Sequence, residues 1–154
     1  MTAITLLAFH LQGQHDQVDH GRSKGGLAGV SGDTLRGGGA TYNLRSRRAP
    51  ARGYAVSPYP ERSRAIPLGE FRENRQAVVR EFVKSNRDLL AQNKHYIGTW
   101  NDSETGKVYL DVSVIETSKG RAINLAKERD QIAIFDMKSF ETIEVDRSAK
   151  SGAK

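Results

Sequence analysis

The sequence predicts an α+β domain, a small and mostly antiparallel sheet with two helices on one face, preceded by a flexible N-terminal tail rich in glycine and arginine. Three observations support this class. Apolar residues recur at helical spacing over residues 68–93 and 118–130, they alternate with polar residues over 107–115, and ten of the 15 glycines lie before residue 66. The chain has 154 residues, which is the length of one domain with a tail.

The tail is predicted from composition. Residues 1–65 hold nine basic and four acidic residues, whereas residues 66–154 hold 15 basic and 14 acidic ones, so most of the net charge of +6 lies in the first part. A segment with many glycines and few large apolar side chains buries too little surface to offset the entropy of ordering it. We therefore assign residues 1–52 to a flexible basic tail, 53–146 to the α+β domain and 147–154 to a disordered C-terminus.

The domain is predicted to begin with a short strand and a long helix. Gly53–Ser57 alternates like a strand, and it ends at Pro58 because proline cannot donate to a central ladder. The helix over 68–93 follows Pro67, which suits a first helical turn. Its apolar stripe, at offsets of three, four, seven and eight, consists of Phe71, Val78, Val79, Phe82, Val83, Leu89 and Leu90.

A hairpin, a second helix and two strands complete the predicted domain. The hairpin turn contains Gly106, and Ser118 is a good N-cap for the helix over 118–130. The remaining predicted strands are 95–100, 107–115, 131–136 and 139–145. The order is β-α-β-β-α-β with one added strand, which matches the ferredoxin-like scheme. Either Gly53–Ser57 or Ser139–Val145 is expected to be the outer strand that extends pairing to a partner strand.

Several function classes are excluded or disfavoured by residue content. The chain has no cysteine, so disulfides, thiol catalysis and cysteine-ligated metal sites are ruled out. The longest apolar stretch, Ala3–Leu11, is too short to span a bilayer, so no membrane contact is predicted. His10, His15 and His20 recur every five residues, which does not place three ligands on one helix face. We therefore favour a linear peptide signal over a metal site, and predict no cofactor.

Four arginines near the end of the predicted tail are candidates for nucleic-acid contact, namely Arg45, Arg47, Arg48 and Arg52. Several such cations give salt-sensitive affinity for phosphates that does not depend on base sequence. The alternative is a solvated charge run that keeps a linker extended. No element that could read base edges is evident, so any DNA or RNA binding is predicted to be non-specific.

An enzyme is the least favoured class. His95, Asp102, Glu104 and Asp111 are its best candidates, since carboxylates and a histidine can exchange protons. A carboxylate pair without a neighbouring histidine, beside a polar turn, is typical of turn structure. No catalytic residue is therefore predicted.

Two parts of the chain resemble a known family. The peptide His15-Asp16-Gln17-Val18-Asp19-His20-Gly21 resembles the His-Asp-Gln-x-x-His-Gly motif of tailed-phage minor capsid and Mu-type head-morphogenesis proteins, chiefly from phages of actinobacteria. The stretch over 53–145, with GYAVS, IGTWNDSETGKVYLDVS and AINLAKERDQIAIFD, resembles a small domain of the same head proteins. In those proteins the motif and domain sit in longer chains, beside modules for which this chain has no room.

The resemblance implies a virion-associated structural protein of a phage head, present in the host cytoplasm during assembly. Its expected partners are capsid or other head proteins, bound by the folded domain, with DNA touched through the basic tail. A non-specific nucleic-acid-binding protein is the alternative, and an enzyme or toxin fragment ranks third.

Overall fold

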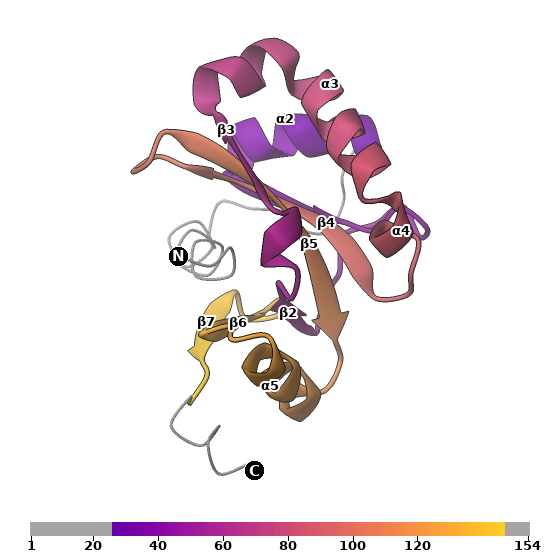
Figure 1. Ribbon diagram of the computed structural model, residues 1–154, viewed down its shortest axis with the longest axis vertical. Coiled ribbons are helices and arrows are strands. Elements are labelled where there is room, and N and C mark those ends of the chain that lie inside the picture. The colour runs from indigo at the N-terminus through magenta and orange to yellow at the C-terminus, as the bar shows by residue number, and fades with distance from the viewer. Residues whose placement is uncertain (1–25, 147–154) are drawn as a thin grey trace.

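The computed structural model describes residues 26–146, and these build a seven-stranded sheet with helices packed on one face (Figure 1). Every strand pairing is antiparallel, in the order β1-β4-β5-β2-β6-β7, and β3 also pairs with β5. The strands are β1 (Gly39–Tyr42), β2 (Tyr54–Val56), β3 (Arg64–Pro67), β4 (His95–Asp102), β5 (Lys107–Glu116), β6 (Ala133–Asp136) and β7 (Glu141–Glu144). The helices are α2 (Leu27–Gly37), the 3-10 turn η1 (Pro60–Arg62), α3 (Leu68–Ser85), α4 (Arg87–Leu90) and α5 (Lys119–Glu128). The predicted α+β class with an antiparallel sheet is confirmed.

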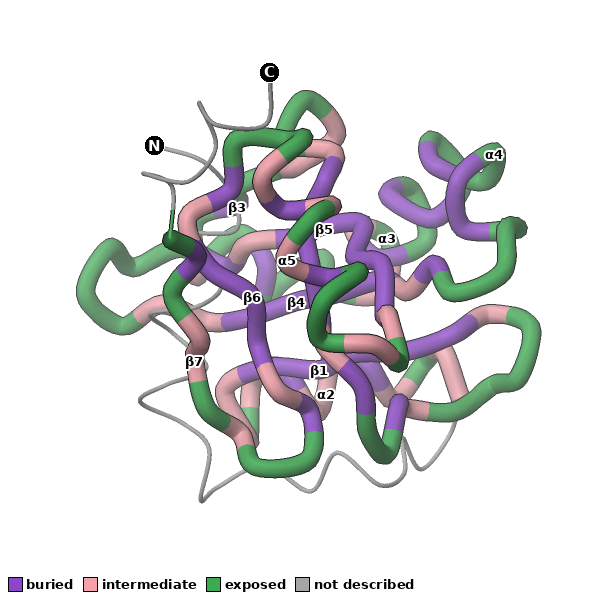
Figure 2. The backbone as a smooth tube through the Cα atoms, turned by 90° about the horizontal axis from the view of Figure 1, so that it is seen from below, coloured by how far each residue is buried: buried purple, intermediate pink, exposed green. Residues whose placement is uncertain are grey.

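Strand β5 lies at the centre of the sheet. Along one edge it pairs with the whole of β4, from His95 opposite Val114 to Asp102 opposite Lys107. Along the other edge it pairs first with β3 and then with β2. Six successive β5 residues are buried, because both faces of this strand are covered (Figure 2).

The helices pack against the face of the sheet formed by Val108, Leu110, Val112 and Val114 of β5. The first three belong to a core cluster with Phe71 and Phe82 of α3 and Val30 of α2. Val114 lies opposite Val56 of β2, and residues directly opposite each other share a face. Val56 packs with Ala122 and Ala126, so α5 covers the same face at the other end of the sheet.

The opposite face carries an aromatic cluster. Trp100 of β4 stacks on Tyr109 of β5 with ring centroids 4.5 Å apart. Phe135 of β6 and Ile115 belong to the same buried cluster. Trp100, which the sequence places in a short strand, is 1% exposed and belongs to the core.

The predicted tail over residues 1–52 is wrong for residues 26–52, which are part of the fold. Helix α2 and strand β1 bury Val30, Thr34 and Tyr42, each at most 2% exposed. The composition argument fails because α2 buries small and polar side chains, and its glycines end the helix: Gly38 has φ of +89°. Residues 1–25 and 147–154, which include the rest of the tail and the predicted disordered C-terminus, lie outside the described residues.

The predicted helix over 68–93 is interrupted. Helix α3 ends at Ser85 because Asn86 leaves helical geometry, and its side-chain amide donates to the carbonyl oxygen of Phe82 at 2.8 Å. The short helix α4 follows from Arg87. The N-cap of α5 is as predicted, since the Ser118 hydroxyl accepts from the amide of Arg121.

The two strands expected at the edges have different positions. Of the two alternatives for the outer strand, Gly53–Ser57 lies inside the sheet, since β2 pairs with β5 on one side and β6 on the other. Strand β7, within the predicted 139–145, does lie at the end of the strand order. Strand β2 sits inside because β6 returns past α5 to pair with it, which is the split β-α-β arrangement.

A substitution in α2 tests whether residues 26–52 belong to the folded core. Val30 is fully buried against α3, so Val30→Ala should lower the free energy of unfolding by about 2 kcal/mol, through lost burial and the cavity left behind. Urea denaturation measures the change. The control is Arg36→Ala on the exposed side of α2, where we expect less than ~0.5 kcal/mol. Equal, negligible effects of both substitutions would mean that α2 is not part of the cooperative fold.

Candidate functional site

The four predicted arginines lie on one ordered loop between β1 and β2. Asn43 organises its first half: its side-chain oxygen accepts from the amides of Arg45 and Ser46, each at 2.8 Å. The backbone then closes, because the amide of Asn43 donates to the carbonyl of Arg48 and that of Arg47 donates to Asn43. This turn fixes the backbone at Arg45, Arg47 and Arg48, which a flexible tail would leave free.

All four arginines are exposed, and the loop from Leu44 to Arg52 contains no acidic residue. Arg45 is tethered, since its guanidinium donates to the side-chain oxygen of Asn93 at 2.8 Å. Arg47 lies beside Gly26, where an added Cβ would be 3.7 Å from its guanidinium. The structure therefore places the four predicted arginines on one ordered and exposed loop, a positive surface that can attract phosphates or carboxylates.

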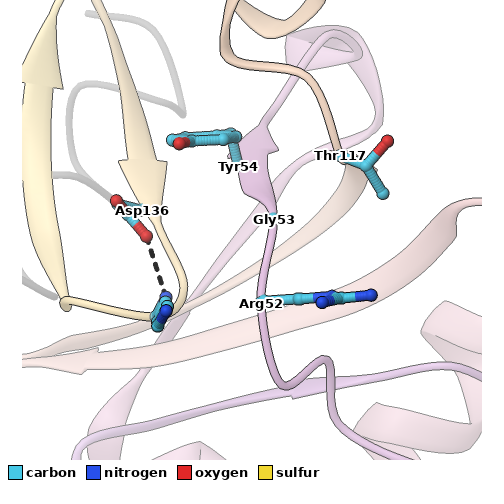
Figure 3. Close-up of a pocket in the computed structure, with 6 residues that line it drawn as sticks. Arg52, Gly53, Tyr54, Thr117 and Asp136 are labelled. Atoms are coloured by element: carbon cyan, nitrogen blue, oxygen red, sulfur yellow. Dashed lines mark hydrogen bonds between the residues drawn. The ribbon is translucent and has the colours of Figure 1, made fainter.

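Only Arg52 among them lines a described pocket, a cavity of about 270 Å³ (Figure 3). Arg52 and Thr117 lie on one side of the chain at Gly53, whereas Tyr54 and Asp136 lie on the other. The Asp136 carboxylate already accepts from the amides of Lys138 and Ser139, at 2.9 and 3.3 Å. The side chains do not converge on one point, so the pocket extends the positive surface toward Lys138 without forming a catalytic centre.

Asp111, a candidate for acid–base chemistry, is buried in the middle of β5 and is 1% exposed. One carboxylate oxygen accepts from the Ser63 hydroxyl at 2.6 Å. The other oxygen has no hydrogen-bond partner among the described residues, and neither does the nearby Ser57 hydroxyl. Asp111 pairs across the sheet with Gly98, whose lack of a side chain leaves room there.

Burial raises the pKa of Asp111 from its ordinary 3.8 to about 6, because the charged carboxylate is removed from water. The hydroxyls of Ser63 and Ser57 lower the pKa, but by less than burial raises it. The Ser63 hydroxyl lowers the pKa more than the Ser57 hydroxyl does, because Ser63 donates a 2.6 Å hydrogen bond to the carboxylate.

The four candidates for an enzyme do not share a site. His95 and Asp102 stand at opposite ends of β4, which at about 3.3 Å per residue separates them by roughly 23 Å. Asp102 builds the hairpin turn, since its carboxylate accepts from the amide of Glu104 and the hydroxyl of Thr105. Glu104 is exposed in that turn, and Asp111 is buried between the two ends.

Both ring nitrogens of His95 are occupied by structural hydrogen bonds. Nδ1 lies 2.8 Å from the carbonyl oxygen of Asn93, which can only accept, so Nδ1 carries the proton. Nε2 then accepts from the Tyr59 hydroxyl at 2.8 Å. The Arg129 guanidinium lies 5.4 Å from the centre of the Tyr59 ring and donates to the carbonyl of Pro58. These contacts hold the loop after β2 onto β4 and α5.

Sequence reasoning missed a second positive surface, on α3 and the start of α4. Arg80, Lys84 and Arg87 are exposed and line a groove of about 550 Å³ beside Leu27 of α2. The signal is present in the sequence, as cations at offsets of four and seven. Its partner helix α2 could not be anticipated, because the glycine content of that segment favoured a tail.

Two predictions fall outside the described residues. The peptide His15, Asp16, Gln17, His20 and Gly21 lies there, as do His10 and the stretch Ala3–Leu11.

Within residues 26–146, no group of three or more histidine, cysteine or acidic residues could hold a metal ion. None of the helices in that range is long and apolar enough to cross a membrane. No family model, curated protein or solved structure matches the chain.

Titration of Asp111 should be visible in stability. The carboxyl group of Asp111 binds a proton more tightly in the folded protein than in the unfolded chain. The protonated group therefore makes its whole contribution to the free energy of unfolding below pH 4, and this contribution is lost as the pH rises through 6. Asp111→Asn keeps an oxygen for Ser63 and removes the charge. It should raise the free energy of unfolding relative to the wild type at pH 8, by up to about 3 kcal/mol, and much less at pH 4.

Urea denaturation at both pH values measures this difference. Glu73→Gln is the matched control, because it removes one exposed carboxylate from α3. A difference between Asp111→Asn and the wild type that is the same at pH 4 and pH 8 would contradict the assignment.

Proposed function

We propose that this chain is a structural protein of a tailed-phage head, and that it works by making protein contacts with capsid or other head proteins. One observation carries the proposal. The three segments that resemble the phage head domain, 53–57, 97–113 and 122–136, supply four neighbouring strands, β4-β5-β2-β6, together with α5. The likeness therefore involves one continuous structural unit, although its segments are far apart in the chain.

The residues that carry the resemblance have structural roles in this unit, so the resemblance supports a shared fold more than a shared chemistry. Trp100 and Tyr109 stack in the core, Asp102 builds the turn, and Gly98 makes room beside Asp111. Side chains with structural tasks of this kind maintain a domain that presents its surfaces to partners. The proposal places the protein in the virion, and in the host cytoplasm during assembly.

Mass spectrometry of particles purified from the phage or prophage that encodes the chain tests this proposal. We expect its peptides in purified particles at a fixed ratio to the major capsid protein. The unfractionated lysate is the control for expression. Presence in the lysate but not in the particles would overturn the proposal.

Non-specific nucleic-acid binding is the second candidate, and the fixed arginine loop favours it. Each phosphate contact contributes about −0.9 to the slope of log affinity against log salt on duplex DNA. Arg48 and Arg52 are exposed, so Arg48→Ala/Arg52→Ala should make that slope shallower by about two.

The measurement is fluorescence anisotropy on a labelled duplex over a series of salt concentrations. Arg72→Ala/Arg75→Ala on α3 removes the same charge from another exposed surface and should leave the slope nearly unchanged. Absence of binding at low salt, or equal changes in both variants, would rule out the loop as a DNA contact.

A further inference from the structure

A groove of about 550 Å³, with a partly apolar floor, is lined by residues of α2, α3 and α4. Figure 1 shows where these helices lie. Leu27 of α2 and Ala77 and Val83 of α3 line it. The two helices are fixed relative to each other, because the side-chain amide of Gln76 donates to the carbonyl oxygen of Ala28 at 3.0 Å and to the Ser31 hydroxyl at 3.1 Å. The groove is therefore a formed surface feature and does not require the helices to separate.

Three cations form one rim of this groove. Arg80 and Lys84 are four residues apart in α3 and so lie on one side of that helix. Arg87 begins α4 beyond the break at Asn86, and it lines the same groove. None of the three forms a salt bridge or a side-chain hydrogen bond with another residue in 26–146, unlike Arg36, Arg62 and Lys94, which are paired. Among residues 26–146, Glu81 is the one acidic residue that lines the groove, and it already accepts from the Ser85 hydroxyl.

The positive surface continues past the start of α2. Gly26 precedes Leu27, and a Cβ added there would lie 3.7 Å from the Arg47 guanidinium. The groove thus has cations along one side, next to an apolar floor, and a further cation lies near the residue that precedes Leu27. A ligand complementary to it carries negative charge and apolar side chains together.

A nucleic-acid backbone supplies the charge but no aliphatic side chains for Leu27, Ala77 and Val83, and the Glu81 carboxylate would face its phosphates. An acidic amphipathic helix supplies both features, with apolar residues every three or four positions along one side. We propose that the groove between α2 and α3 binds an acidic amphipathic segment of a partner protein. This site is independent of the proposed virion role, because binding can be measured in solution with the isolated protein.

The probe is a short fluorescein-labelled peptide with leucine every three or four residues and glutamate at most other positions. The full chain should bind it, and Arg80→Glu/Lys84→Glu should weaken the binding at least about tenfold, because two attractions become repulsions. The same peptide with lysine in place of glutamate should not bind. Fluorescence anisotropy at physiological salt measures all three affinities.

Arg72→Glu/Arg75→Glu is the matched control, since it reverses two exposed charges on α3 that do not line the groove. We expect it to change the affinity less than twofold, with circular dichroism spectra unchanged in both variants.

Three outcomes would overturn the proposal. The acidic peptide does not bind, both variants weaken its binding equally, or duplex DNA binds more tightly than the peptide and Arg80→Glu/Lys84→Glu abolishes that DNA binding. Self-association that this variant abolishes would assign the groove to a second copy of the chain. Loss of peptide binding would leave the virion proposal intact, and absence from particles would leave the groove intact.

Discussion

The register of β5 is the constraint on which the rest of the structure depends. This strand pairs with β4 along one edge and with β3 and β2 along the other, so three strands are aligned by it. A slip of one residue would exchange Val112 with Asp111 or Ser113 between the two faces. The helices of one face and the aromatic cluster of the other could not both form. The hairpin turn at Asp102–Gly106 fixes the register, because the Asp102 carboxylate accepts two hydrogen bonds there and Gly106 adopts a φ of +71°.

The second edge of β5 is interrupted, and the interruption explains the buried carboxyl group. Between Val56 opposite Val114 and Arg64 opposite Leu110, seven residues stand against three on β5. Pro58 and Pro60 lie in this bulge, where no ladder hydrogen bonds are required of them. The Ser63 hydroxyl reaches the Asp111 carboxylate from the bulge. Asp111 thus serves as a hydrogen-bond acceptor for the irregular segment between β2 and β3. Burial of its charged carboxylate lowers the stability of the fold at neutral pH.

The sequence patterns that depend on neighbours along the chain gave correct elements, and those that depend on distant contacts did not. Alternation over 107–115, the helical stripe from Phe71 and the cap at Ser118 are local, and each corresponds to an observed element. Alternation still misplaced Asp111, because it predicts one polar face while β5 is covered on both. Strand β3 is four residues long and owes its existence to pairing with β5. Helix α2 buries Val30, Ser31 and Thr34, and the side chains of Thr34 and Thr99 of β4 are hydrogen-bonded to each other. Amino-acid composition cannot predict a contact between two residues so far apart in the chain.

The folding of residues 26–52 changes how the positive charge can act. On a flexible tail the arginines would bind with an ordering cost at each contact, and would favour no particular shape of partner. On the fixed loop, held by Asn43 and Asn93, that cost is already met in folding, so the arrangement of charges can select among partners. Helix α2 also creates the groove against α3, which would not exist without it. Residues 26–52, which composition assigns to a tail, thus supply the arginine loop and one wall of the groove. These are the two positive surfaces that can bind a negatively charged partner.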